Sequence, residues 1–418
     1  MIEPQPLAAT GRPTKTGISL NRTRKTLIVL FTKFMTQLRF LILSLLFAVA
    51  RPTLASPAGP RLPMVVRYVF PRDTLFPPGQ IDARSLTRIN YAFANIAVGR
   101  IVTGYRFDAE NFAYLNGLKE DNPSLTVLVS VGGWLWSTNF SDAALTRPSR
   151  RNFVQSVMDF LDRYRLDGLD IDWEYPGTRG AGHPFRPEDK RNFTRLLKDL
   201  HTEFKRRARK TRHRLFLTFA AGASQEYIAH TELSKLRKYV DTVNLMAYDD
   251  YVPTMSPLTG HHAPLHTNPT DPAHISAEAS AQSFEKAGVP AAKILLVVPF
   301  YGHAWAHVPA LNHGLFQSSR PAPQGYAPYS VLAGAIGKSG FTRYWDPVSS
   351  VPHLYDPAKQ TFISYEDTES LALMGEYVLD HRLGGIMFWD YKSDPSGQLL
   401  SVVNHALHPI PATHKEAQ

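Results

Sequence analysis

The chain has 418 residues, of which 44% are hydrophobic and 20% charged, proportions typical of a globular protein. It contains no cysteine, which excludes disulfide bonds, thiolate metal sites and cysteine nucleophiles. The formal net charge is +10, but residues 1–61 alone carry +8, so the nearly neutral remainder gives no support to nucleic-acid binding.

An apolar run at residues 40–50 follows Lys33 and Arg39 near the start of the chain. Its length fits the core of a secretory signal peptide and falls short of the ~20 residues that span a bilayer. We expect residues 1–55 to be an N-terminal extension with a signal peptide, cleaved after Ala55. An uncleaved signal anchor is the alternative. The mature protein is therefore expected to be secreted and extracellular, without a stable membrane anchor.

Beyond residue 63 the chain alternates β-rich apolar runs with amphipathic stretches. Most of the runs are continuously apolar, as parallel strands buried on both faces are. Strands are predicted at 64–70, 88–96, 125–134, 168–175, 214–221, 242–248, 294–301 and 384–390, and helices at 153–164, 190–209, 277–287 and 370–381. This α/β pattern favours a (β/α)8 TIM barrel, with chemistry at the C-terminal strand ends. A doubly wound open sheet is the alternative, but the glycine spacing of its phosphate-binding loop is missing.

Residues 306–364 separate the seventh strand from the last helices and hold Gly, Pro, aromatics and short β-like runs. A connection of this length is improbable as a bare loop. We expect a small α+β insertion subdomain here, inside a catalytic domain of residues 62–408.

The segment 167–176 carries the strongest chemical signal. It spaces Asp170, Asp172 and Glu174 by two, so a β-strand would send all three to one face and the apolar residues between them to the other. Crowded, partly desolvated carboxylates repel each other, so at least one should hold a proton near neutrality and serve as a general acid. The alternatives are a cation-paired cluster or an oxygen-ligand metal site. The apolar back of the strand and its rigidity argue against both.

The motif D-G-x-D-x-D-x-E followed by Tyr175 and Pro176 resembles the signature of family 18 glycoside hydrolases, the chitinases. Three other segments resemble that family as well, and the resemblance extends over residues 64–405: S-x-G-G at 130–133, M-x-Y-D at 246–249 and the last strand, which carries Trp389. The resemblance implies catalytic roles for five residues. Glu174 would be the general acid and base, Asp172 would orient the acetamido group of the substrate, and Asp170 would share a proton with Asp172. The Tyr248 hydroxyl would support the acetamido carbonyl, and Asp249 would bind nearby.

The same resemblance implies a sugar-binding cleft formed at the strand ends. Its substrate-binding residues would be Tyr68, Phe93, Gly132, Gly133, Trp134, Tyr175, Met246, Tyr301 and Trp389. Trp136, Tyr251, Trp305 and Trp345 are further aromatic candidates for the distant subsites.

Histidine marks one departure from the family pattern. The seventh strand ends in Tyr301-Gly302-His303, where the family usually has Arg, and we expect altered substrate affinity or pH dependence. The other histidines, including His261, His262 and His266, are interpreted as scattered structural residues. No metal ligand set and no cofactor are expected.

These observations predict a secreted, monomeric chitinase, most simply of endo type, that hydrolyses β-1,4 N-acetylglucosamine linkages of chitin or chitooligosaccharides with retention, by a substrate-assisted mechanism. One alternative is a chitin-binding lectin without turnover. The other is an endo-N-acetylglucosaminidase acting on N-glycans or peptidoglycan. The presence of Glu174, Asp172 and Tyr248 together favours catalysis.

Overall fold

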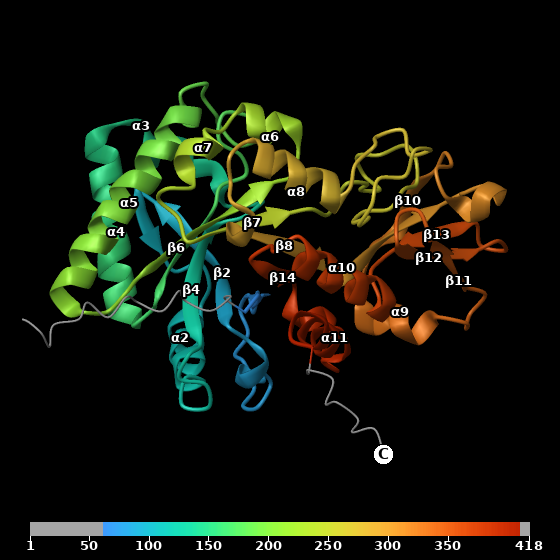
Figure 1. Ribbon diagram of the computed structural model, residues 1–418, viewed down its shortest axis with the longest axis horizontal. Coiled ribbons are helices and arrows are strands. Elements are labelled where there is room, and N and C mark those ends of the chain that lie inside the picture. The colour runs from blue at the N-terminus through green and yellow to red at the C-terminus, as the bar shows by residue number, and fades with distance from the viewer. Residues whose placement is uncertain (1–61, 410–418) are drawn as a thin grey trace, which may run out of the picture. The chain divides into compact units, whose positions relative to one another are not determined.

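The computed structural model describes residues 62–409 (Figure 1). The predicted signal peptide lies outside the described residues. No helix within residues 62–409 combines the length and the apolar character needed to cross a membrane.

Eight parallel strands close into a barrel, because the first strand pairs with both the second and the last. The strands follow the chain order around the barrel, as the TIM fold requires. They are β1 (Met64–Val69), β2 (Arg88–Ala97), β4 (Thr126–Gly132), β5 (Gly168–Asp172), β6 (Phe216–Gly222), β7 (Thr242–Met246), β8 (Ile294–Pro299) and β14 (Gly385–Trp389). The predicted barrel is confirmed, and the open-sheet alternative is wrong. A short strand, β3 (Arg100–Val102), extends β2 in the antiparallel sense.

Helices cover the outside of the barrel (Figure 1). They are α2 (Asp108–Gly117), α3 (Phe140–Leu145), α4 (Arg147–Tyr164), α5 (Asp189–Thr211), α6 (Gln225–Ala229), α7 (Leu233–Leu236), α8 (Ala277–Lys286), α10 (Thr368–Asp380) and α11 (Gln398–Leu407). Helix α4 begins earlier than the apolar periodicity predicts, because Thr146 and Ser149 form a capping box and Pro148 occupies its first turn. Helix α10 begins in the same way at Asp367.

A second, antiparallel sheet lies between β8 and α10. Its strands pair in the order β10-β9-β13-β12-β11, and one helix accompanies them. The elements are β9 (Tyr301–Ala306), β10 (Arg320–Pro328), α9 (Tyr329–Ala335), β11 (Thr342–Asp346), β12 (Val351–Asp356) and β13 (Thr361–Ser364). Strand β9 starts directly after β8, so this sheet begins at the rim of the barrel.

The apolar residues divide into two main layers. The larger cluster lies between the barrel and its helices, where Leu169, Ile171 and Trp173 pack. A smaller cluster fills the barrel itself and includes Val66, Leu295 and Met387. Because side chains alternate along a strand, the positions of β5 between its outward apolar residues must point into the barrel. The predicted two-faced strand is therefore present, and its carboxylates face inward.

Candidate active site

Asp170 lies at the base of the site, inside the barrel. Strand register places Ser130 of β4 and Thr218 of β6 on either side of it. Both hydroxyls donate to Asp170, as do Tyr68 Oη at 2.8 Å and Asn244 Nδ2 at 2.9 Å. Burial raises the pKa of Asp170, but the donors, Thr218 first, oppose that shift by favouring the ionised form. Asp170 is therefore an anchored carboxylate that organises four strands.

Asp172 follows one level higher and is also buried. Its Oδ1 has no hydrogen-bond partner among the described residues. Burial raises the pKa of Asp172 well above its usual range, and the nearby charges of Glu174 and Asp170 add to the effect. Burial and the neighbouring carboxylates therefore favour the protonated form of Asp172.

Strand β5 ends at Asp172, three residues earlier than the predicted end at Tyr175. Glu174 therefore lies just beyond the strand, two residues after Asp172. Its backbone N–H donates to Ser137 Oγ at 2.9 Å, which fixes the turn that carries it. The pKa of Glu174 is raised to about 7. Burial is the largest cause and the charge of Asp249 adds to it, while the hydrogen bond with Tyr175 opposes the shift. A carboxyl group with this pKa can both give and take a proton near neutrality.

Two glycines at the end of β4 allow the catalytic strand to approach closely. A Cβ at Gly132, where φ is +107°, would lie 2.2 Å from the backbone oxygen of Asp172. A Cβ at Gly133, where φ is +75°, would lie 2.7 Å from the ring of Phe93. Only glycine fits both the space and the left-handed backbone at these positions.

Aromatic rings form the floor of the site. Trp389 at the end of β14 stacks on Phe93, with ring centroids 5.7 Å apart, and meets the edge of Tyr68 at 5.3 Å. Trp134 is 44% exposed and stands beside Tyr175. Flat apolar rings of this kind suit the faces of sugar rings.

Asp249 lies across the cleft from this floor, with its side chain 40% exposed. It accepts hydrogen bonds from Tyr301 Oη at 2.6 Å and His303 Nε2 at 2.8 Å. Burial would raise the pKa of Asp249, but His262 and His303 outweigh it and hold that pKa below its usual range. Burial lowers the pKa of His262 to about 4, so its ring is neutral at physiological pH. The carboxylate of Asp249 is therefore ionised, and the buried His262 lies beside it, with Nδ1 3.6 Å from Oδ1 of Asp249.

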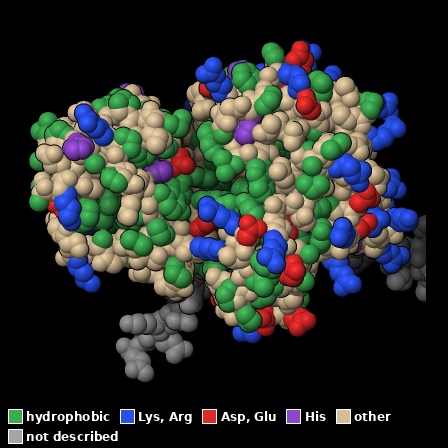
Figure 2. All heavy atoms as spheres, turned by 180° about the vertical axis from the view of Figure 1, so that it is seen from behind, with side chains coloured by type: hydrophobic (Ala, Val, Ile, Leu, Met, Phe, Trp, Pro, Cys, Tyr) green, Lys and Arg blue, Asp and Glu red, His purple; other side chains and the backbone are tan. Residues whose placement is uncertain are grey.

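A single cleft of about 990 Å³ collects most of the predicted residues. Figure 2 shows hydrophobic side chains gathered in the hollow between the insertion and the barrel. Asp170 and Gly133 do not line the cleft; they contact the lining residues Tyr68 and Phe93. The predicted residues on its walls are Tyr68, Phe93, Gly132, Trp134, Asp172, Glu174, Tyr175, Met246, Tyr248, Asp249, Tyr301 and Trp389.

Of the four aromatic candidates for the distant subsites, one lines the cleft. Trp136 lines the cleft, but Tyr251 and Trp305 are buried in the core of the insertion with Tyr355 and Phe362. Trp345 does not line the cleft either. Several other residues that line the cleft carried no signal in the sequence, namely Phe70, Tyr105, Arg179, Asp250, Met255 and Tyr326. Tyr326 stacks on Tyr301 from the insertion, and nothing in its Pro- and Gly-containing segment could have indicated this contact.

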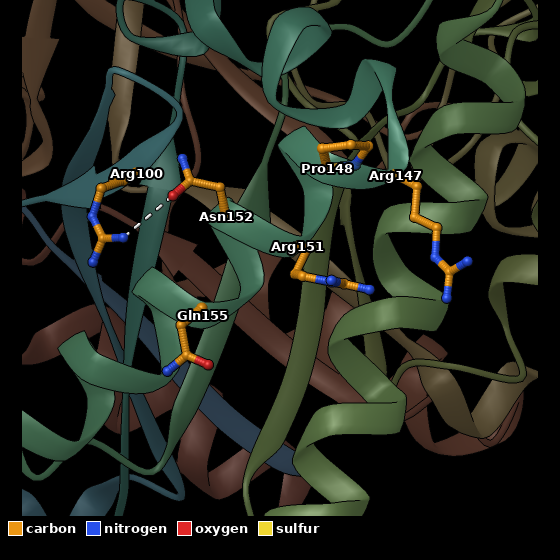
Figure 3. Close-up of a pocket in the computed structure, with 6 residues that line it drawn as sticks. All are labelled: Arg100, Arg147, Pro148, Arg151, Asn152 and Gln155. Carbon is orange, nitrogen blue, oxygen red and sulfur yellow. Dashed lines mark hydrogen bonds between the residues drawn. The ribbon is translucent and has the colours of Figure 1, made fainter.

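A second cavity, of about 480 Å³, lies outside the barrel between β3 and α4 (Figure 3). Arg100 donates to Asn152 at 3.3 Å in its wall, and Arg147 and Arg151 border it. It contains none of the predicted site residues and no carboxylate, so it offers no group for acid–base chemistry.

The comparisons with known proteins agree with this geometry. The model of glycosyl hydrolases family 18 matches residues 65–394. Chitinase A1 of Niallia circulans is 38% identical over 317 residues, which are 72% of this chain and 45% of that protein. The chain thus spans less than half the length of that relative.

Two solved structures show the same fold. A family 18 N-acetylglucosaminidase from Paenibacillus barengoltzii superposes with a TM-score of 0.76 at 39% identity, covering 82% of this chain and 99% of the other. Human YKL-39, described as a pseudo-chitinase with retained chitooligosaccharide binding, has a TM-score of 0.75 at 24% identity over 82% and 99% of the chains, a likeness of fold alone. With the family match spanning the barrel and its catalytic strand, the chain belongs to family 18 of the glycosyl hydrolases.

Proposed function

We propose that this protein is a secreted, monomeric, endo-type chitinase that hydrolyses β-1,4 N-acetylglucosamine linkages with retention. The observation that carries the proposal is Glu174: a carboxyl group with a pKa near 7 on the wall of an aromatic-lined cleft. Acid catalysis requires a proton held near neutral pH, and Glu174 supplies it.

In the first step Glu174 would protonate the glycosidic oxygen. An ordinary retaining enzyme would then use a second carboxylate as nucleophile. Asp172 suits that role poorly, because burial and the nearby carboxylates favour its protonated form. Oδ1 of Asp249 already accepts hydrogen bonds from Tyr301 and His303. The carbonyl oxygen of the substrate's own N-acetyl group is therefore the nucleophile in this proposal. It attacks the anomeric carbon as the bond from that carbon to the protonated glycosidic oxygen breaks, and the leaving sugar departs as an alcohol.

The resulting oxazolinium ion needs stabilisation on two sides. Asp172 would accept the acetamido N–H, and its proton can move toward Asp170 as positive charge develops. The hydroxyl of Tyr248, which lies on the wall of the same cleft, would hold the acetamido oxygen in line. In the second step Glu174 takes a proton from a water molecule. The water oxygen attacks the anomeric carbon from the face opposite the oxazolinium C–O bond, and that bond breaks. Two inversions at the anomeric carbon give net retention, and the scheme uses only groups of the chain and the substrate.

The first experiment is hydrolysis of chitotetraose by the purified protein beside its Glu174→Gln variant. The proposal expects cleavage by the wild type and a loss on the order of 1000-fold in the variant, since general acid catalysis contributes 10²–10⁴-fold. A folded wild type that binds the oligomer without cleaving it would instead be a chitin-binding lectin. If the wild type neither cleaves nor binds the oligomer, N-glycans or peptidoglycan become the substrates to test.

A second candidate keeps the chemistry and changes the product. The similarity to the Paenibacillus barengoltzii N-acetylglucosaminidase over 99% of that chain favours removal of single N-acetylglucosamine units. The products of chitotetraose separate the two candidates. Endo cleavage yields mostly dimers at early times, whereas the second candidate yields monomer and trimer.

Export can be tested independently of activity. The proposal expects the protein in the culture medium, with an N-terminus that begins near Ser56. A membrane-bound product that retains residues 40–50 would favour the signal anchor.

A further inference from the structure

Three side chains from three separate segments of the chain converge beside the cleft. Asp249 follows β7, His262 lies in the loop after it, and His303 is the third residue of β9. Their ligand atoms all lie within 4.8 Å of one another. Oδ1 of Asp249 is 2.8 Å from Nε2 of His303 and 3.6 Å from Nδ1 of His262. Two imidazoles and a carboxylate are a preferred donor set for late first-row transition metals.

His262 is the member of the cluster that the protein itself leaves unsatisfied. Its side chain is fully buried, and neither ring nitrogen has a hydrogen-bond partner among the described residues. The nearest carboxylate oxygen, Oδ1 of Asp249, lies just beyond hydrogen-bond range of Nδ1. A buried polar group without a partner costs about 1–3 kcal/mol, so a ligand that fills this position gains affinity from it.

The groups around the cluster already hold two of its members in a ligand orientation. Nδ1 of His303 lies 3.3 Å from the carbonyl oxygen of Gly325, to which it can donate while Nε2 faces Asp249. Metal-binding histidines commonly donate their second N–H to a backbone carbonyl in this way. Tyr301 donates to Oδ1 of Asp249 and fixes the carboxylate.

We infer that Asp249, His262 and His303 form a binding site for one divalent late first-row transition metal ion, with Zn²⁺ as the representative. Tetrahedral coordination at the usual bond lengths separates neighbouring ligand atoms by about 3.4 Å. The distances of 2.8 and 3.6 Å from Asp249 bracket that value, and the ligand atoms of His262 and His303 lie within 4.8 Å of each other, so side-chain shifts on the order of 1 Å complete the site. The ion replaces the proton that Nε2 of His303 shares with Asp249, and that proton leaves to solvent. A fourth position opens toward the cleft, because Asp249 and His303 line it.

The ion would compete with the sugar. This consequence rests on the proposed function, in which Asp249 is a substrate-binding group. Zinc on Asp249 withdraws its carboxylate from the sugar, so zinc raises the apparent KM of chitotetraose and leaves kcat at saturating substrate unchanged.

The binding claim is tested without sugar, so its failure is distinguishable from failure of the proposed function. Chelator-treated protein is titrated with Zn²⁺ by calorimetry, beside the variants His262→Asn and His266→Asn. His266 is the matched control, because it is another histidine of the same loop that faces a carboxylate, Glu278, at 3.0 Å. We expect one tight zinc ion per chain, unchanged in His266→Asn and weakened on the order of 100-fold in His262→Asn.

Titration with Co²⁺ supplies a second readout. Tetrahedral coordination by nitrogen and oxygen should produce visible absorption bands in the wild type and in His266→Asn but not in His262→Asn. If His262→Asn does not fold, as judged by thermal melting, His303→Arg replaces it, because a guanidinium removes a ligand and keeps a donor for Asp249. Zinc binding that is equally tight in the wild type and in a folded ligand variant, or no tight site in the wild type, overturns the inference.

Discussion

The phenol of Tyr68 on the first barrel strand donates a 2.8 Å hydrogen bond to Oδ2 of Asp170, a residue 102 positions later on β5. The contact crosses the interior of the barrel and joins the cleft wall, where Tyr68 lies, to the carboxylate beneath the reacting groups. Strand β5 is thus anchored to the other strands through its buried carboxylate, Asp170.

Replacement of Asp170 by Ala should be costly for folding. Donors from Tyr68, Ser130, Thr218 and Asn244 would lose their acceptor inside the barrel. We expect a loss of about 3–5 kcal/mol, visible as a fall in Tm on thermal unfolding. Asp159→Ala is the control, since Asp159 is 56% exposed and pairs with Arg100 and Gln155 on the surface. Equal Tm values for the two variants would contradict the anchoring role.

The raised pKa of Glu174 predicts a pH-dependent gain of stability in Glu174→Gln. The ordinary pKa is 4.5 and the folded value is about 7. Below 4.5 both states of the wild type hold the proton, so Glu174 has no effect on the pH dependence. Between 4.5 and 7 only the unfolded state ionises, so the wild type loses stability as pH rises. The variant does not titrate there, and its advantage should grow to on the order of 3 kcal/mol above pH 7.

Thermal melting of both proteins at pH 4 and pH 7.5 measures this difference. Glu120→Gln, at an exposed position, is the control for removing a carboxylate as such. A stability difference between Glu174→Gln and the wild type that is the same at both pH values would refute the raised pKa.

Tyr248→Phe should slow the chemical step. The hydroxyl lines the cleft and is assigned to the acetamido oxygen in the proposed mechanism. Removing one such preorganised donor costs about 10²–10³-fold in kcat. Tyr301→Phe is the matched change, because that hydroxyl serves Asp249 and should mainly raise KM. Initial rates on chitotetraose over a range of concentrations separate the two; a kcat of Tyr248→Phe within twofold of the wild type would be inconsistent with this role.

His303→Arg should change the substrate affinity. Nε2 of His303 lies 2.8 Å from Oδ1 of Asp249, whereas the longer arginine side chain would meet that carboxylate with a planar fork of donors. Because Asp249 is the proposed substrate-binding group, we expect the KM for chitotetraose to change while kcat stays the same. Initial rates over a range of substrate concentrations measure both constants. An unchanged KM would remove His303 from substrate recognition.

Gly132→Ala should disturb the site through the backbone. Its Cβ would collide with the oxygen of Asp172 at 2.2 Å, in a left-handed conformation. Gly79→Ala is a control with φ +75° and nothing within 4 Å of the added carbon, which isolates the conformational cost of about 1 kcal/mol. We expect Gly132→Ala to lose at least about 2 kcal/mol more than this control. Similar Tm values for both would show that the strand end tolerates the side chain.

The inward direction of Asp170 and Asp172 could be predicted because it follows from strand period alone. The positions of Gly132 and Gly133 could be predicted too, since a motif at a strand end fixes both the site and the need for space. The end of β5 could not: Trp173 and Glu174 look like strand residues, but the hydrogen bond from Glu174 to Ser137 turns the chain away after Asp172.

Residues outside the barrel were harder to place. His262 lies in a loop with no periodicity, so nothing in its surroundings indicated that it meets a residue of β9. Trp305 is on the same face of β9 as Tyr301, yet it lies about 13 Å further along the strand, where the insertion's own core covers it. Strand period gives the face of a residue but not what covers that face.

Strand β9 belongs to the insertion, and its first and third residues, Tyr301 and His303, hold Asp249. An exchange of the insertion with that of a relative would therefore transplant Tyr301 and His303 as well. A chimaera designed only to alter the length of the binding groove would also inherit the donor's way of holding Asp249. Engineers who want to vary the groove alone should place the junction after His303.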